Sequence, residues 1–136
     1  MKHPLLSLAL TCLYLLHASA LVNVQPDFDI TKFAGKWNLI AMAMKEGQPS
    51  DVNRIHTTVV SDNDGVIAFK TRVPVGKECK RLQTRFFPDE QPGIYRTDLG
   101  KTTIYIMKTD YVRYAILFIY TKEMEVLHLY GAGNPR

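Results

Sequence analysis

Cysteine is scarce in this sequence, which has only Cys12 and Cys79 among its 136 residues. Cys12 lies within an N-terminal segment that we expect to be removed, so Cys79 would be the only thiol of the mature chain. A secreted domain with an odd cysteine pairs with another chain, keeps a reactive thiol, or has lost its intramolecular partner. The sequence leaves these three alternatives open.

Motifs of enzymes and of bound groups are absent as well. The sequence has no Gly-x-Ser-x-Gly, His-Glu-x-x-His or Cys-x-x-Cys motif and no glycine loop that would hold a phosphate. His56 and His128 are too isolated to indicate a metal site. The sequence therefore predicts a protein that is not an enzyme and that uses no metal or cofactor. A thiol-dependent activity of Cys79 is the one alternative, because basic residues flank it.

Acidic residues are fewer than basic ones, with 13 Asp and Glu against 17 Lys and Arg. The local excess falls on Lys70, Arg72, Lys77, Lys80, Arg81 and Arg85. Such an excess is compatible with an acidic ligand or surface, but the solvated outer face of a β-sheet carries Lys and Arg routinely. We therefore expect no nucleic-acid partner.

The longest predominantly apolar stretch lies near the N-terminus, over residues 5–16, and it is too short to cross a membrane. Lys2 precedes it, and Ala18-Ser19-Ala20 follows it with the small residues of a signal-peptidase site. This pattern predicts a signal peptide over residues 1–20, one domain over 21–136, and a secreted, extracellular protein without a membrane span. A buried N-terminal helix is the alternative interpretation.

Helical periodicity is absent after residue 34, and the sequence consists instead of strand-like segments separated by turn residues. Strands are expected over residues 37–44, 54–61, 66–73, 78–87, 94–97, 101–108, 111–121 and 124–130. Asp62-Asn63-Asp64-Gly65 is typical of a hairpin turn. Eight strands joined by short turns predict an all-β fold, either an up-and-down antiparallel barrel or a sandwich.

The alternation of side chains along a strand indicates which residues would line the interior of a barrel. In the first strand, Trp37, Leu39 and Ala41 share one face. In the seventh strand, one face would carry Ala115, Leu117 and Ile119. The other face of that strand is also apolar and would carry Tyr114, Ile116, Phe118 and Tyr120. The eighth strand places Val126, His128 and Tyr130 together. Because both faces of the seventh strand are apolar, we expect something to cover its outer face.

Three separated motifs give this chain its resemblance to a known family. Gly35-Lys36-Trp37 opens the first strand, Thr109-Asp110-Tyr111 lies between the sixth and seventh, and Leu129-Tyr130-Gly131 closes the eighth. Their order and spacing, over residues 28–131, resemble the lipocalin family. The resemblance implies an eight-stranded antiparallel up-and-down barrel, or calyx, which Trp37 closes at one end. Gly35, Trp37, Thr109, Asp110, Tyr111, Tyr130 and Gly131 would be its structural motif residues.

The resemblance also implies that the calyx holds a small hydrophobic molecule, such as a fatty acid, retinoid, steroid or odorant. The residues expected to line it are Leu39, Ala41, Phe69, Leu82, Ile104, Ile106, Leu117, Ile119, Val126 and His128. Burial of apolar ligand surface would drive binding, with one or two polar side chains setting the orientation.

Several features depart from the lipocalin pattern. Ala132 stands where the family usually has a basic residue beside the tryptophan. The family's C-terminal helix, and the tail cysteine that would pair with Cys79, are apparently missing. The alternative function is therefore a ligand-free interaction protein that joins a partner chain through its exposed barrel wall or through Cys79. A homo- or hetero-dimer through Cys79 is left open.

Overall fold

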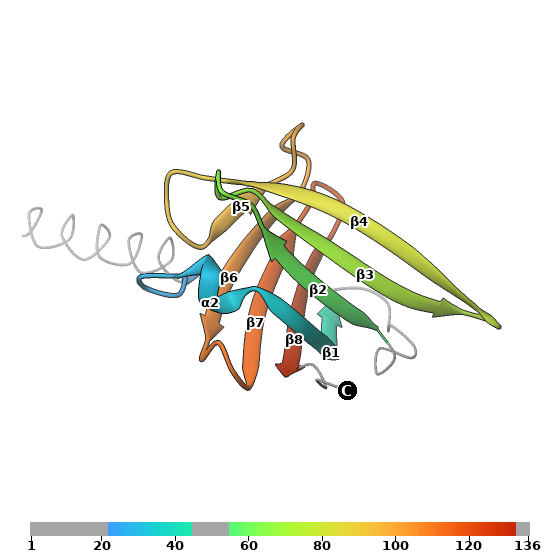
Figure 1. Cartoon of the computed structure of the whole chain (residues 1–136). Coiled ribbons are helices and arrows are strands. Elements are labelled where there is room, and N and C mark those ends of the chain that lie inside the picture. Colours follow the sequence, from blue (N-terminus) through green and yellow to red (C-terminus); the bar gives the residue numbers. More distant parts are fainter. Residues whose placement is uncertain (1–21, 45–54, 133–136) are drawn as a thin grey trace, which may run out of the picture.

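Eight antiparallel strands follow one another around a closed barrel in the computed structural model (Figure 1). The structure describes residues 22–44 and 55–132, so the predicted signal peptide lies outside the described residues. A one-turn helix, α2 (Ile30–Phe33), precedes the first strand. The strands are β1 (Gly35–Met44), β2 (His56–Ser61), β3 (Ile67–Val75), β4 (Glu78–Pro88), β5 (Ile94–Arg96), β6 (Thr103–Thr109), β7 (Tyr114–Tyr120) and β8 (Glu125–Ala132).

Each strand pairs with its neighbours in the chain, and β1 closes the barrel by pairing with β8 from Trp37↔Ala132 to Met44↔Val126. This arrangement confirms the predicted up-and-down barrel. No helix among the described residues is long and apolar enough to cross a membrane.

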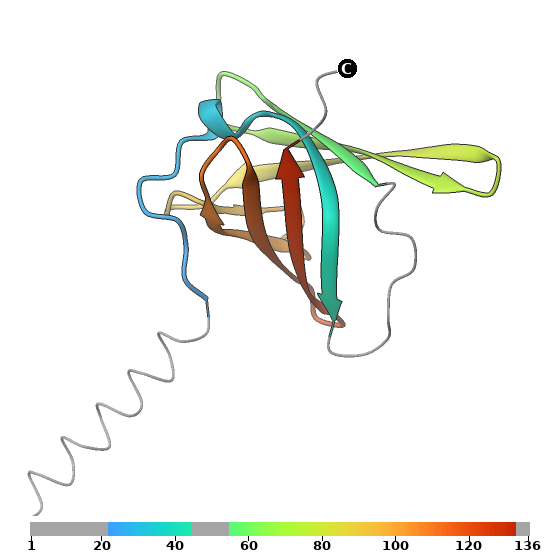
Figure 2. The ribbon, with the colours of Figure 1, turned by 90° about the horizontal axis from the view of Figure 1, so that it is seen from below.

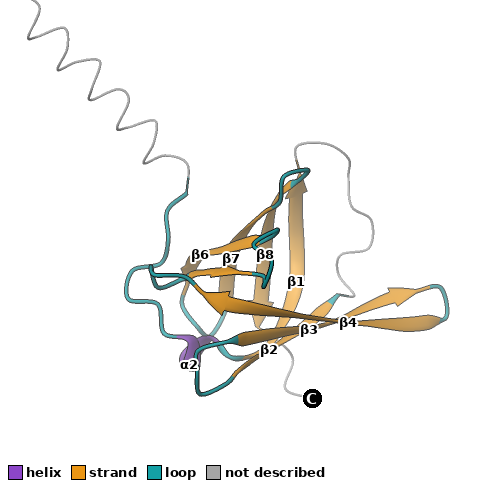
Figure 3. Cartoon of the chain, turned by 90° about the horizontal axis from the view of Figure 1, so that it is seen from above, coloured by secondary structure: helices purple, strands orange, loops and turns teal. Residues whose placement is uncertain are grey.

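The hairpin of β3 and β4 is much longer than its surroundings and projects beyond the rest of the barrel (Figures 2 and 3). The two strands pair with each other from Ile67↔Phe86 to Val75↔Glu78, whereas β4 pairs with the short β5 only at Phe87 and Pro88. Every residue of β4 from Glu78 to Arg85 is therefore exposed.

Side-chain oxygens fix two of the turns between strands. Asp62 accepts hydrogen bonds from the backbone N–H groups of Asp64 and Val66, which closes the predicted β2–β3 turn. Between β6 and β7, Asp110 accepts backbone hydrogen bonds as far as Tyr114, so β7 begins at Tyr114 and not at residue 111 as predicted. Asx-type bonds of this kind compete with strand pairing and therefore end a strand.

The core fills the end of the barrel where β1 begins. Its buried side chains come from the segment before β1, from α2 and from all eight strands: Phe28, Phe33, Trp37, Leu39, Val59, Ile67, Phe69, Phe86, Tyr95, Ile104, Ile106, Ala115, Leu117 and Tyr130. Side chains further toward the other end are less buried, including Met42 and Ile119. The barrel therefore has a packed floor and a more open mouth.

Candidate functional site

The floor of the calyx is built around Trp37, as predicted. Its indole Nε1 donates a hydrogen bond to the carbonyl oxygen of Phe33 at 2.9 Å, and the two rings stack with their centroids 5.2 Å apart. Phe28 packs edge-on against Phe33 at 5.4 Å. The segment from Phe28 to Trp37 thus folds under the barrel and covers its end with aromatic surface, which is the largest apolar contribution available per side chain.

The Thr109-Asp110-Tyr111 motif stabilises the same end of the barrel. The Asp110 carboxylate accepts hydrogen bonds from the backbone N–H groups of Val112, Arg113 and Tyr114 and from Arg113 Nε. These donors hold the pKa of Asp110 far below its usual range. Tyr111 has a positive φ of 68°, and its hydroxyl oxygen accepts a hydrogen bond from the backbone N–H of Asp29. The motif therefore joins the β6–β7 turn to the segment before β1.

Eight of the ten residues predicted to line the calyx come together on the inner face. The six buried residues are Leu39, Phe69, Ile104, Ile106, Leu117 and Val126. The two half-buried residues are Ile119 and His128. Strand register explains the convergence, because Leu117 lies opposite both Ile106 on β6 and His128 on β8. The predicted alternation along β7 gives the inward positions of Leu117 and Ile119, and the register with β6 and β8 extends this face to the neighbouring strands.

The prediction for Ala41 was wrong. The pairing of β1 with β8 shifts register between Leu39 and Ala41, which is a β-bulge. A bulge inserts one extra residue and reverses the alternation beyond it. Ala41 is consequently exposed, and Met42 packs against the core in its place. The sequence alternates Ala and Met over residues 41–44 and so contains no local signal for the bulge.

The prediction for Leu82 was also wrong. Leu82 lies opposite Thr71 and therefore has the inward alternation, but it belongs to the part of β4 that pairs with β3 and has no partner in β5. Its side chain is 53% exposed. Parity along a strand predicts the face of a residue but not its depth in the barrel.

A chain of polar side chains crosses the inner wall, and only part of it was predicted. His128 Nδ1 lies 2.9 Å from the hydroxyl of Tyr130, which is in turn hydrogen-bonded to Thr57. Thr57 Oγ1 lies 3.1 Å from Thr71 Oγ1 on β3. Burial raises the pKa of Tyr130 to about 12 and lowers the pKa of His128 to about 4, so both groups are neutral near pH 7.

Thr57 and Thr71 were missed because the side chains that they meet are set by strand register, which the sequence pattern does not give. The β-branched composition of residues 54–61 predicted a strand but not which side of it faced the interior. Only the register of β2 with β3 places Thr57 opposite Thr71.

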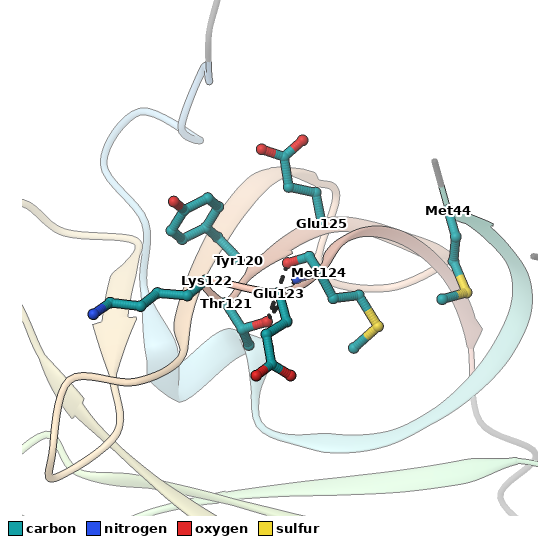
Figure 4. Close-up of a pocket in the computed structure, with 7 residues that line it drawn as sticks. All are labelled: Met44, Tyr120, Thr121, Lys122, Glu123, Met124 and Glu125. Atoms are coloured by element: carbon teal, nitrogen blue, oxygen red, sulfur yellow. Dashed lines mark hydrogen bonds between the residues drawn. The ribbon is translucent and has the colours of Figure 1, made fainter. Parts of the chain in front are cut away.

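The mouth of the barrel carries a pocket of about 560 Å³ between the end of β1 and the β7–β8 hairpin. Figure 4 shows Met44 and Met124 on facing sides of it, while Lys122 points away. The hairpin is held by hydrogen bonds between Thr121 and Met124. Flexible thioether side chains adapt to ligands of different shapes, so this rim is suited to admit an apolar molecule.

Cys79 lies outside the calyx. It is opposite Pro74 near the tip of the projecting hairpin, and it is exposed and unpaired. Among the described residues, no group of three or more His, Cys, Asp and Glu side chains is arranged to hold a metal ion.

Comparison with known proteins identifies the family of this barrel. The model of the lipocalin / cytosolic fatty-acid binding protein family matches residues 34–134. The chain belongs to this family. Human lipocalin-15 is 29% identical over 126 residues, which cover 89% of this chain and 68% of that protein. The extracellular fatty acid-binding protein of Gallus gallus is 27% identical over 137 residues, covering 95% of this chain and 74% of that protein.

A further relative is major urinary protein 20 of Mus musculus, which is 25% identical over 134 residues, covering 93% of this chain and 72% of that protein. The family is described as one of lipocalins and fatty-acid binding proteins, and the Gallus gallus relative is named as a binding protein, which supports a binding function and not an enzymatic one. This lipocalin is accordingly a binding protein for small hydrophobic molecules.

Proposed function

We propose that this lipocalin is secreted and carries in its calyx a small hydrophobic molecule that is electrically neutral and has one hydrogen-bonding group. The observation that carries the proposal is the hydrogen bond between His128 and Tyr130 on an inner wall that is largely apolar and carries no charged group among its buried side chains. Extracellular transport is supported by the name of the Gallus gallus relative, and by the signal-like residues 1–20 of the sequence.

The apolar part of the ligand would lie among the inward side chains above the floor. Trp37 and Leu117 are buried, at 4% and 0% exposure, and leave no room below them. Met42, Ile119 and His128 are only partly buried, so a ligand could cover them further. Covering apolar surface contributes roughly 25 cal/mol per Å².

The polar part of the ligand would meet His128. Nδ1 of His128 is taken by Tyr130, and none of the described residues is hydrogen-bonded to Nε2. Because burial lowers the pKa of His128 to about 4, this imidazole offers one hydrogen bond and no charge at neutral pH.

The charge distribution favours a neutral ligand over a carboxylate. Every Lys and Arg side chain that the structure describes is exposed, including Lys70 and Arg113. A carboxylate moved into the calyx would lose its hydration without gaining a described cation in return, which costs several kcal/mol. A long-chain alcohol, ketone or ester loses far less.

Competition binding tests this proposal. The purified secreted chain is loaded with a neutral apolar fluorescent probe, N-phenyl-1-naphthylamine, which is then displaced by dodecanol or by dodecanoate at pH 7. We expect saturable probe uptake and displacement by the alcohol at a concentration at least tenfold lower. The variant His128→Leu should lose this preference, whereas the matched control His56→Leu, on the outer face, should keep it.

Two results would contradict the proposal in different ways. Absence of saturable uptake would refute the carrier function of the calyx. Uptake with tighter binding of dodecanoate would leave a carrier but refute the neutral ligand class.

The alternative function, covalent association with a partner chain, is supported by one observation, the exposed and unpaired Cys79. Non-reducing electrophoresis of secreted wild-type protein and of the variant Cys79→Ser tests it. A disulfide-linked species present only in the wild type would support association, and a monomeric wild type would refute it.

A further inference from the structure

Basic side chains gather on the outer face of the sheet formed by β2, β3 and β4. Phe69 of β3 and Phe86 of β4 are buried on its inner face. Along each strand, the residues that alternate with these inward positions therefore point outward. These outward positions include Lys70 and Arg72 on β3, and Arg81 and Arg85 on β4. Lys36 of β1 continues the row of Lys70, because it lies opposite Thr58, and Thr58 lies opposite Lys70. We call these five residues the cationic face.

The cationic face has no acidic residues to balance it. None of the outward residues of β2, β3 and β4 is Asp or Glu. The described ion pairs lie elsewhere, at Arg96–Asp89 and Arg113–Asp110. Moreover, Arg72 and Arg81 are directly opposite each other. Like charges in such a pair destabilise a sheet, so intramolecular stability does not account for the arrangement.

A groove of about 400 Å³ runs over the same face. Its lining includes Lys70, Arg72 and Arg81 together with the neutral hydrogen-bonding side chains of Thr58 and Gln83. Neighbouring strands are about 4.8 Å apart, and outward residues on one strand are about 6.7 Å apart. The groove therefore presents cations at intervals suited to an extended chain of anionic groups.

We propose that the cationic face binds a sulfated polysaccharide of the extracellular matrix or cell surface. Guanidinium groups bind tetrahedral oxyanions through two parallel hydrogen bonds, and Arg72 and Arg81 place two such groups side by side. The hydroxyl of Thr58 and the amide of Gln83 add neutral donors in the adjoining row. This function is separate from the calyx, because the two sites are on opposite faces of the same sheet.

The composition of the groove favours a sulfated polysaccharide over other polyanions. None of its lining residues is aromatic, whereas single-stranded nucleic acids are held by stacking on aromatic rings. Arg85 packs over Phe87 at 5.5 Å, so that ring is already covered by a side chain. The exposed apolar side chain that the groove has on the outer face is Val60, which is small compared with the Trp, Phe and Leu anchors of membrane-surface segments.

The test measures binding of the full secreted chain to a heparin octasaccharide as a function of salt concentration. The double variant Arg72→Gln/Arg81→Gln is compared with the wild type and with Lys101→Gln/Lys108→Gln. Both variants lose two charges, but the control lysines are exposed residues outside the cationic face. We expect the first variant to bind at least tenfold more weakly at 0.15 M salt, with a salt dependence reduced by about one unit per cation, and the control to change less than twofold.

The proposal is overturned if both variants lose affinity equally, because net charge and not the cationic face would then determine binding. It is overturned as well if the wild type prefers single-stranded DNA or phosphatidylserine vesicles to the octasaccharide, or if desulfated heparin binds equally well. Probe uptake by the calyx, measured on the same samples, verifies that each variant is folded.

Discussion

Trp37 is bound to the backbone of Phe33 as well as stacked on its ring, and this pair closes the floor of the barrel. The hydrogen bond from Nε1 and the stacked contact link the one-turn helix to the first strand across four residues. A helix of four residues has too few internal hydrogen bonds to be stable alone. Its position therefore depends on Trp37.

Replacement of Trp37 separates the two contributions. Trp37→Phe keeps an aromatic ring but leaves the Phe33 carbonyl without its donor, so we expect a loss of about 1–3 kcal/mol of unfolding free energy. Trp37→Ala also creates a cavity and should cost about 3–5 kcal/mol. Urea unfolding followed by circular dichroism measures both. Equal losses for the two variants would show that the hydrogen bond is unimportant.

The hydrogen bonds to Asp110 predict a specific dependence of stability on pH. Because its pKa is lowered in the folded protein, the carboxylate stabilises the fold above its ordinary pKa of 3.8, and this contribution is lost as the pH falls below that value. Asp110→Asn should therefore melt below the wild type at pH 7, and the difference should shrink toward pH 2. Asp98→Asn, at an exposed carboxylate, is the control. A difference that does not change with pH would contradict this interpretation.

His128 predicts a second pH effect of a different origin. Its pKa falls from 6.5 to about 4 on burial, so the unfolded chain binds a proton that the folded barrel excludes between these values. Stability should decrease as the pH falls from 6.5 toward 4, by up to about 3 kcal/mol. His128→Phe should remove this part of the pH dependence, while His56→Gln should retain it. Unfolding free energies measured at half-unit pH intervals test both variants.

The sequence was sufficient to predict the fold and most of the interior. Strict alternation in β7 placed Ala115 and Leu117 inside. This feature is local, because it depends only on neighbouring residues, and it could therefore be predicted from the sequence pattern. The closed end at Trp37 and Asp110 was expected from the resemblance to the lipocalin family and not from a local pattern.

The remaining features depend on how distant strands meet. The bulge beside Ala41 arises from the pairing of β1 with β8, and the exposure of Leu82 arises because β5 is too short to cover β4. Likewise, the link from Tyr130 to Thr57 joins strands at opposite ends of the chain. No local pattern in the sequence encodes how these strands meet, so these features could be identified only from the structure.

The bulge in β1 makes a prediction that reverses the simple alternation. Ala41→Lys should change stability by less than about 0.5 kcal/mol and leave probe uptake intact, because residue 41 is exposed. Met42→Lys should abolish uptake, since it would place an ammonium group among the inward side chains. Parallel titrations with N-phenyl-1-naphthylamine compare the two variants. The opposite ranking would show that β1 keeps an uninterrupted alternation in solution.

Because Arg72 and Arg81 lie opposite each other, a substitution that removes one of these charges should raise the stability of the fold and weaken polyanion binding. Arg81→Glu converts a like-charged cross-strand pair into an oppositely charged one, and we expect it to raise the unfolding free energy by about 0.2–1 kcal/mol. The same change should weaken heparin binding more than Arg81→Gln does, because it adds repulsion to the lost contact. The stability gain should shrink in 1 M salt, where the Debye length falls to about 3 Å. Thermal melts of the wild type and both variants at low and high salt measure the change in stability, and heparin titrations of the same proteins measure the change in affinity. If neither Arg81→Gln nor Arg81→Glu is more stable than the wild type at low salt, the two guanidinium groups do not repel each other, and the like-charged pair is not retained at a cost in stability.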